Sequence, residues 1–150
     1  MAGKTDAFEL DFLKLIFNGT PIANIADNAA TAPITNLYLS LHTADPTDAA
    51  AGQSTNEISY TGYARVALTR DTSSTGWTCA TVGGVSSAKP NSTISFGLCT
   101  AGSGTATYAG IGTGSSGAGK LLYVGQITPG IVVGSGVTPQ FTTQTYISED

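Results

Sequence analysis

The chain has 150 residues, enough for one domain with a core that folds without covalent staples. Only 11% of its residues are charged, and the formal net charge is −4, with six basic residues scattered along the chain. This balance argues against nucleic acid as a partner, and so little charge suits a protein that packs against neighbouring subunits.

Residues 6–17 carry the helical pattern of this chain. Asp6 can cap the N-terminus, with Glu9 three residues later as in a capping box, and Asn18-Gly19 supplies a left-handed stop. Apolar residues cover nearly every side of the predicted helix. We expect it to pack on its own domain or, in addition, to insert into a neighbouring subunit. The candidate interface residues are Phe8, Phe12, Leu13, Ile16 and Phe17.

Residues 19–36 contain Pro21, Pro33 and several Ala and Asn residues, which predicts an arm or a long loop. We therefore expect an N-terminal helix and arm over residues 1–35 and one compact β-sandwich domain over residues 36–150. No run of ~20 apolar residues exists, so no membrane span is expected. Acidic residues interrupt the N-terminal stretch, which argues against a signal peptide.

The segment 37–42 alternates like a strand. Leu37, Leu39 and Leu41 share one face, because side chains alternate with a period of two. His42 is out of phase with them, so we expect it on the outer face. The pattern predicts a loss of about 2–5 kcal/mol for Leu39→Ala or Leu41→Ala, and a far smaller loss for His42→Ala.

The rest of the chain consists of short β-branched or aromatic segments flanked by Gly, Ser, Asn or Pro, which predicts strands. These segments lie near residues 57–60, 63–70, 93–97, 105–111, 120–128 and 137–146. The expected fold is mainly β, an antiparallel β-sandwich or jelly-roll-like domain with one N-terminal α-helix. Trp77 is expected at a corner or core edge where its ring N–H finds a partner.

The two cysteines, Cys79 and Cys99, could bridge neighbouring strands or remain as free thiols. A reducing compartment such as the cytosol would keep them as thiols. Together with His42 they make three soft ligands without zinc spacing, so no metal site is expected.

Residues 114–120 imitate a phosphate-binding loop, G-x-x-x-x-G-K. The following residue should carry a hydroxyl group and open a helix, but it is Leu121 in a strand pattern. The overlapping spacing Gly112-x-Gly114-x-x-Gly117 also lacks the helix and acidic residue of a dinucleotide site. We expect a flexible hairpin connection here, and no cofactor.

Other polar residues are candidates for catalytic or metal-binding groups. A Ser–His–Asp arrangement around His42 is possible in composition, but no G-x-S-x-G elbow supports it. Asp45 and Asp48 flank a proline like a paired carboxylate, yet a turn explains Asp45 and calcium needs more oxygen ligands. Glu57 and Arg65 could pair across strands or subunits. No catalytic, cofactor-binding or metal-binding residue is predicted, and we expect no enzyme.

Three stretches carry a family resemblance: "LYLSLHTADPTD", "EISYTGYARVALT" and "GKLLYVGQIT". They resemble a family of small tailed-bacteriophage virion proteins, often described as tail-fibre-like or minor structural. The departures are residues 77–99 and 110–119. The matching residues are Leu37, Tyr38, Leu41, Thr43, Ala44, Asp45, Pro46, Glu57, Gly62, Tyr63, Ala64, Arg65, Leu121, Leu122, Tyr123, Gly125 and Thr128.

The resemblance implies a virion protein assembled in the host bacterial cytoplasm. A compact β-domain with an arm favours a capsid decoration (cement) protein, with the major capsid protein or other virion subunits as partners. We also expect a homo-oligomer, and neither nucleic acid, membrane nor small-molecule substrate as a partner. The alternative is a tail or tail-fibre-associated component, with receptor or carbohydrate binding. A repeating shaft or trimeric coiled coil, more usual in a fibre, is not evident in the sequence.

Overall fold

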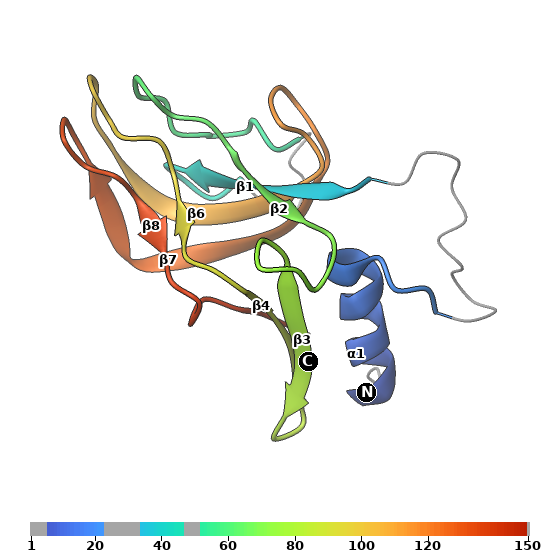
Figure 1. The fold of residues 1–150 in the computed structure, drawn as a ribbon. Coiled ribbons are helices and arrows are strands. Elements are labelled where there is room, and N and C mark those ends of the chain that lie inside the picture. Colours follow the sequence, from blue (N-terminus) through green and yellow to red (C-terminus); the bar gives the residue numbers. More distant parts are fainter. Residues whose placement is uncertain (1–5, 23–33, 47–51, 150) are drawn as a thin grey trace. The chain divides into compact units, whose positions relative to one another are not determined.

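The computed structural model describes residues 6–22, 34–46 and 52–149, and the fold of these residues is mainly β with antiparallel sheets and one short N-terminal helix (Figure 1). This confirms the predicted fold class, while the sandwich or jelly-roll arrangement stays a prediction. The elements are α1 (Asp6–Leu13) with a π-helical turn (Lys14–Asn18), β1 (Asn36–His42), β2 (Val66–Thr69), β3 (Trp77–Val82), β4 (Val85–Pro90), β5 (Ile94–Ser95), β6 (Gly104–Gly112), β7 (Leu121–Val133), β8 (Gln140–Phe141) and β9 (Ile147–Glu149).

The strands form a four-stranded sheet of order β2-β1-β6-β7, a three-stranded sheet of order β3-β4-β9, and the pair β5-β8. The predicted strand at 36–42 is confirmed, and those at 63–70, 93–97, 105–111 and 120–128 overlap observed strands. The predicted strand at 57–60 is wrong, because this segment makes only an isolated bridge between Glu57 and His42. The segment 137–146 contains only the two-residue strand β8.

By its internal contacts the chain divides into two compact units. The first comprises Met1–Asn36, Leu68–Ile94 and Phe141–Asp150, and the second comprises Leu37–Ala67 and Ser95–Gln140. The predicted boundary between residues 35 and 36 stays a prediction.

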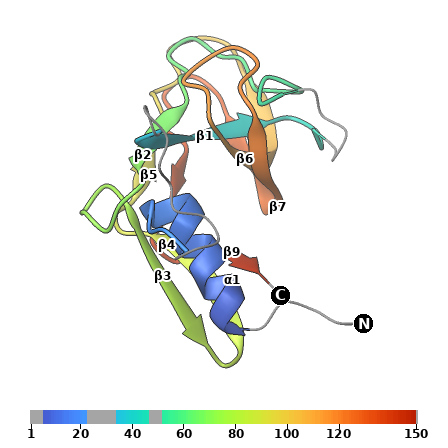
Figure 2. The same cartoon turned by 90° about the vertical axis from the view of Figure 1, so that its right-hand side faces the viewer.

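In the first unit, α1 packs against β3, β4 and β9 (Figure 2). Leu13 and Phe17 are fully buried, and the Phe17 ring lies 4.6 Å from the Trp77 ring between centroids. The expected left-handed stop is confirmed: Gly19 has φ 65° and donates its N–H to the carbonyl of Lys14. The predicted cap at Asp6 rests on a side chain outside the described residues.

Arg70 covers the C-terminal end of this helical segment. Its Nε donates to the carbonyl of Ile16 at 2.6 Å, and its Nη2 donates to that of Leu15 at 2.7 Å. A cation at a helix C-terminus satisfies orphan carbonyls and complements the helix dipole. Arg70 therefore fastens the helix to the segment that leads into β3.

The hairpin β3–β4 was missed from the sequence. Its strands pair from Trp77 opposite Pro90 to Val82 opposite Val85. Gly83 and Gly84 form the two-residue turn with φ 62° and 83°. Positive φ at both positions is what a tight hairpin turn requires, and glycine supplies it without steric cost.

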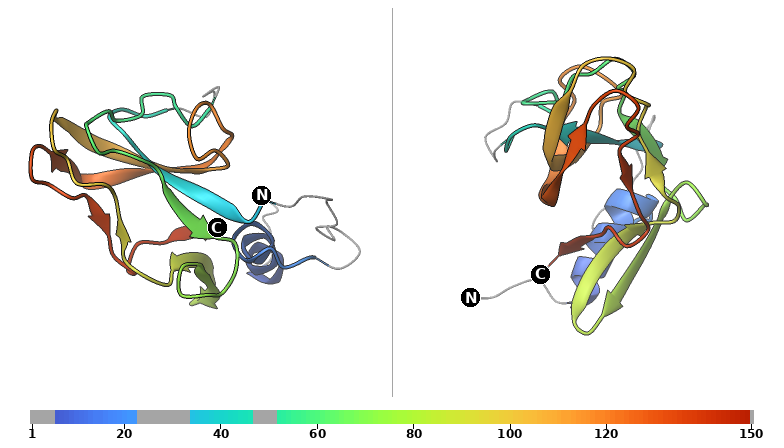
Figure 3. Two further views of the ribbon diagram at one scale, coloured as in Figure 1. Left: turned by 45° about the horizontal axis from the view of Figure 1, so that its top comes forward. Right: turned by 90° about the vertical axis from the view of Figure 1, so that its left-hand side faces the viewer.

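In the second unit, β1 pairs antiparallel with β6, with Leu41 opposite Ala109 and His42 opposite Tyr108. Strand β6 continues into β7, and the two run side by side as a long curved hairpin (Figure 3). Leu37, Leu39 and Leu41 are all buried, as their alternation predicts.

Candidate functional site

Both faces of β1 are covered in the second unit. Ser40 and His42, on the face opposite the leucines, are each 0% exposed. The expectation of an outward-facing His42 is therefore wrong. Its alternation was read correctly, but residues 52–58 lie along the same strand: the Ile58 N–H donates to the Leu41 carbonyl at 2.9 Å.

His42 is held at both ring nitrogens. Its Nδ1 lies 2.8 Å from the carbonyl oxygen of Thr55, which can only accept, so Nδ1 carries the proton. Its Nε2 then accepts from the hydroxyl of Ser40 at 2.9 Å. Burial lowers the pKa of His42, and the charge of Arg65 adds to this, against opposing contributions from Thr55 and Glu57. The imidazole is consequently neutral near pH 7.

Arg65 and Glu57 form a bidentate ion pair within the chain. Nε donates to Oε1 and Nη2 to Oε2, both at 2.7 Å, with side chains 2% and 17% exposed. Tyr63 donates its hydroxyl to Glu57 at 2.8 Å and accepts the Leu41 N–H. Burial by itself would raise the pKa of Glu57, but hydrogen bonds from Arg65 and Tyr63 and the Arg65 charge lower it overall.

The remaining N–H groups of Arg65 hold the connection between β6 and β7. Nη1 donates to the Gly114 carbonyl at 2.8 Å, and Nη2 donates to the Gly117 carbonyl at 2.7 Å. A phosphate loop would aim its N–H groups at a ligand. Here carbonyls of the loop point at a guanidinium group instead, and a strand follows. The predicted hairpin connection is confirmed.

Gln53 joins the two halves of this polar network. It is fully buried; its Nε2 donates to the Tyr38 carbonyl at 2.7 Å and to Ser40 Oγ at 3.3 Å. Its Oε1 accepts from the Gly114 N–H at 3.2 Å and from Arg65 Nη1 at 3.3 Å. Its own N–H donates to the carbonyl of Ala118. The segment at 52–58 and the β6–β7 connection are thus tied to each other.

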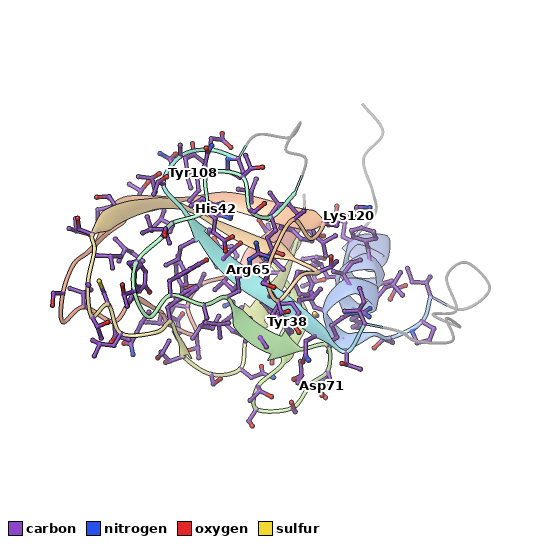
Figure 4. All side chains as sticks on the ribbon, turned by 90° about the horizontal axis from the view of Figure 1, so that it is seen from above. Tyr38, His42, Arg65, Asp71, Tyr108 and Lys120 are labelled. Atoms are coloured by element: carbon purple, nitrogen blue, oxygen red, sulfur yellow. The ribbon has the colours of Figure 1, made fainter. Side chains whose placement is uncertain are left out.

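Two glycines of β6 make room for this network. A Cβ atom at Gly110 would lie 2.7 Å from His42 Nε2, and one at Gly112 would meet the Gln53 side chain. Real Cβ atoms do not approach so closely, so larger residues at these two positions would displace the polar groups. Figure 4 labels His42 and Arg65 within the network, with Tyr108 opposite His42 on β6.

The chemistry open to this network is limited by its burial. Ser40 and His42 lie at a nucleophile–base distance, but neither is exposed. The group that orients His42 is the Thr55 carbonyl, where a catalytic triad places a carboxylate. The geometry is that of a structural network, which joins β1, residues 52–65 and the β6–β7 connection.

The sequence analysis did not identify Ser40, Gln53 or Tyr63 as partners. Two signals were available. The polar residues Tyr38, Ser40 and His42 alternate opposite the leucines, and β6 carries glycine where it faces Tyr38 and Ser40. A polar face against glycines indicates that a buried side chain needs the space.

The predicted interface residues lie on α1 and the turn after it. Leu13 and Phe17 are buried within the chain, and Phe12 and Ile16 are half-buried. The Phe8 side chain and all of Asp48 lie outside the described residues. A role of these five residues in contacts with other subunits stays a prediction.

The cysteines are free thiols. The Cys79 thiol donates to Asn18 Oδ1 at 3.0 Å, and burial raises its pKa to about 11, so it is a poor nucleophile. Contrary to expectation, the indole N–H of Trp77 is buried without a partner among the described residues. No described helix is long and apolar enough to cross a membrane.

Residues 14–147 match the protein family described as Gp80, podophage GP4 fiber I protein gp80. The chain belongs to this family. No curated protein matches it. The match spans parts of both units and includes every residue of the polar network. It confirms the predicted resemblance to small tailed-phage virion proteins of the tail-fibre-like kind.

The family supports the predicted alternative, a tail or tail-fibre component, better than the first choice of function. Its description names a fibre protein, which makes the chain a phage structural protein and a virion component. Capsid decoration finds no support in it. Capsid decoration was favoured by a compact β-domain with an arm and by the missing fibre shaft, but one subunit need not contain the repeating part of a fibre.

Proposed function

We propose that this chain is a non-enzymatic structural subunit of a podophage fibre, in contact with other virion subunits and with copies of itself. The observation that carries the proposal is the family match over residues 14–147. The match covers nearly the whole chain, so the proposed fibre role does not rest on a short segment of it.

The buried network supports a structural role. Its histidine, carboxylate and guanidinium groups bond to one another or to backbone carbonyls. Groups engaged in this way stiffen loops and are not presented to a substrate. The low proportion of charged residues, 11%, also suits a surface that is partly covered in an assembly.

The test is to locate the subunit in the particle. Fab fragments raised against the folded protein are bound to purified virions and imaged by electron cryomicroscopy. We expect Fab density on the fibres at the tail. Fab density over the capsid shell would contradict the proposal.

A genetic experiment provides the second measurement. Phage with an early stop codon in this gene should yield DNA-filled capsids whose fibres are missing or incomplete. Supplying the protein in trans should restore them. Particles with complete fibres would contradict the proposal, whatever their infectivity.

A further inference from the structure

His42 is the single histidine of the chain, and it lies inside a closed set of hydrogen bonds. The Ser40 hydroxyl beside it has one proton and two acceptors within reach. His42 Nε2 lies 2.9 Å away, and the Gly110 carbonyl lies 3.2 Å away. While the imidazole is neutral, the hydroxyl donates to Nε2, since that nitrogen then has no other donor.

We propose that His42 is an acid-sensitive latch whose protonation loosens the segment 52–58 and the connection 113–120. A proton from solvent would bind the lone pair of Nε2, and no covalent bond would break. The Ser40 hydroxyl would turn to the Gly110 carbonyl and accept the new N–H. The hydrogen bonds are thereby kept, and the change is a positive charge placed in a buried site.

The surroundings compensate this charge only in part. Glu57 lies near enough to favour it, but both carboxylate oxygens already accept from Arg65. Arg65 itself repels it. Tyr63 donates its hydroxyl to Glu57, and Tyr108 lies opposite His42 on β6. Burial raises the pKa of Tyr63, so its hydroxyl offers no negative charge near neutral pH.

Water would stabilise the positive charge of the imidazolium, but residues 52–58 lie over the ring and keep solvent away from it. Thr55 in this segment holds Nδ1, and Gln53 at its start holds the 113–120 connection through Ala118 and Gly114. Displacement of the segment would admit water to the imidazolium and would release the anchor of the connection. The two loops should therefore open together.

The direction of the pH effect follows from linkage. The pKa of His42 in the closed state is below its ordinary value of 6.5, so the open state binds more protons. Above pH 6.5 His42 is neutral in both states, so its protonation does not favour opening. Each pKa unit of lowering favours opening by about tenfold as the pH falls between the two values.

The experiment follows His42 and the loops on the same protein. The His42 ring is titrated by NMR, and hydrogen–deuterium exchange is measured by mass spectrometry from pH 8 to pH 5, corrected for intrinsic rates. We expect protection of 52–58 and 113–120 to fall from near pH 6.5 downward, about tenfold for each unit by which the closed-state pKa of His42 is lowered, and to level off at the midpoint of the ring titration. The hairpin β3–β4 serves as internal reference and should keep its protection.

Two variants separate the histidine from the nearby carboxylate. In His42→Gln the acid-dependent loss should vanish, whereas Glu57→Gln should keep it with a lower midpoint. An unchanged acid midpoint in His42→Gln would overturn the proposal, as would a wild-type ring that titrates while protection stays constant. If His42→Gln does not fold, His42→Asn replaces it. If neither folds, the wild-type protein decides, by whether protection begins to fall near pH 6.5 and levels off at the midpoint of the ring titration.

Discussion

Arg65 engages its whole guanidinium group in hydrogen bonds. The guanidinium group has five N–H donors, and five hydrogen bonds connect it to Glu57, Gln53, Gly114 and Gly117. A lysine cannot reproduce this planar fork. The role of Arg65 is therefore to fix three backbone segments to one another.

Removing Arg65 should cost far more than removing an exposed cation. Arg65→Met removes the charged partner of Glu57, which keeps only its hydrogen bond from Tyr63, and it also removes the donors to two backbone carbonyls. We therefore expect a loss of about 3–5 kcal/mol in the free energy of unfolding. The control Lys89→Met, at an exposed position where the ammonium group lies 5.8 Å from the Tyr146 ring centroid, should change it by about 1 kcal/mol or less. Urea unfolding measures both, and equal small losses would contradict the buried ion pair.

The ion pair also predicts a pH dependence. The pKa of Glu57 is lowered in the folded state from an ordinary value of 4.5, so the folded state holds fewer protons than the unfolded one. Its contribution is present above pH 4.5 and is lost as the pH falls through the folded pKa. Urea unfolding from pH 7 to pH 3 should show a shallower acid loss in Glu57→Gln than in the wild type.

Alanine substitutions at His42 and at Leu41 should lower the stability of the protein by similar amounts. Both are fully buried, so His42→Ala leaves a cavity and removes the partners of Ser40 and the Thr55 carbonyl. We expect a loss of about 2–5 kcal/mol for each alanine variant. Denaturant melts near pH 8 measure the two side by side. A near-neutral His42→Ala would show that the ring is exposed in solution.

At the scale of elements, turn glycines decide how strands are joined. Gly83 turns β3 into β4 with a positive φ, and nothing lies within 4 Å of a Cβ atom built there. The cost of a side chain at Gly83 is therefore conformational and not steric crowding. A β-branched residue tolerates this backbone region worst, and asparagine tolerates it best after glycine.

The hairpin turn gives a matched comparison. Gly83→Val should destabilise the protein by about 1–2 kcal/mol, and Gly83→Asn by clearly less. Gly134→Ala is the control, because its surroundings are equally open and its φ is not positive. Thermal melts followed by circular dichroism measure the series. Equal effects of valine and asparagine would contradict the positive φ.

At the scale of the whole molecule, α1 belongs to the packing of the first unit. Phe17 packs against Trp77, the single tryptophan, which is 2% exposed as a residue. The surfaces of Leu13 and Phe17 are already used inside the chain. Among the described side chains of this helical segment, Asp11 is exposed and Phe12 and Ile16 are half-buried, so these remain accessible for a contact with another subunit.

Removal of the helix should therefore change tryptophan fluorescence. Deleting residues 1–18 uncovers Trp77, and we expect a red-shifted emission with loss of protection in β3 and β4. Phe17→Ala should cost about 3–5 kcal/mol, and the half-buried Phe12→Ala less. An unshifted emission together with failed assembly would instead support the helix as an assembly element.

The sequence alone determined the local features of this protein. Leucine alternation placed β1 and its core face, Asn18-Gly19 ended the helix, and Leu121 excluded a phosphate loop, because each is set by residues close in sequence. The Gly83-Gly84 turn was equally local, and its signal was overlooked. The motifs at 37–48, 57–69 and 119–128 indicated the family. Only the tertiary structure decided what covers each face: alternation shows that His42 and Leu41 point apart, but not that residues 52–58 close over His42. The bonds from Arg65 to Gly114 and Gly117 span about fifty residues, and chain geometry, not periodicity, brings such groups together.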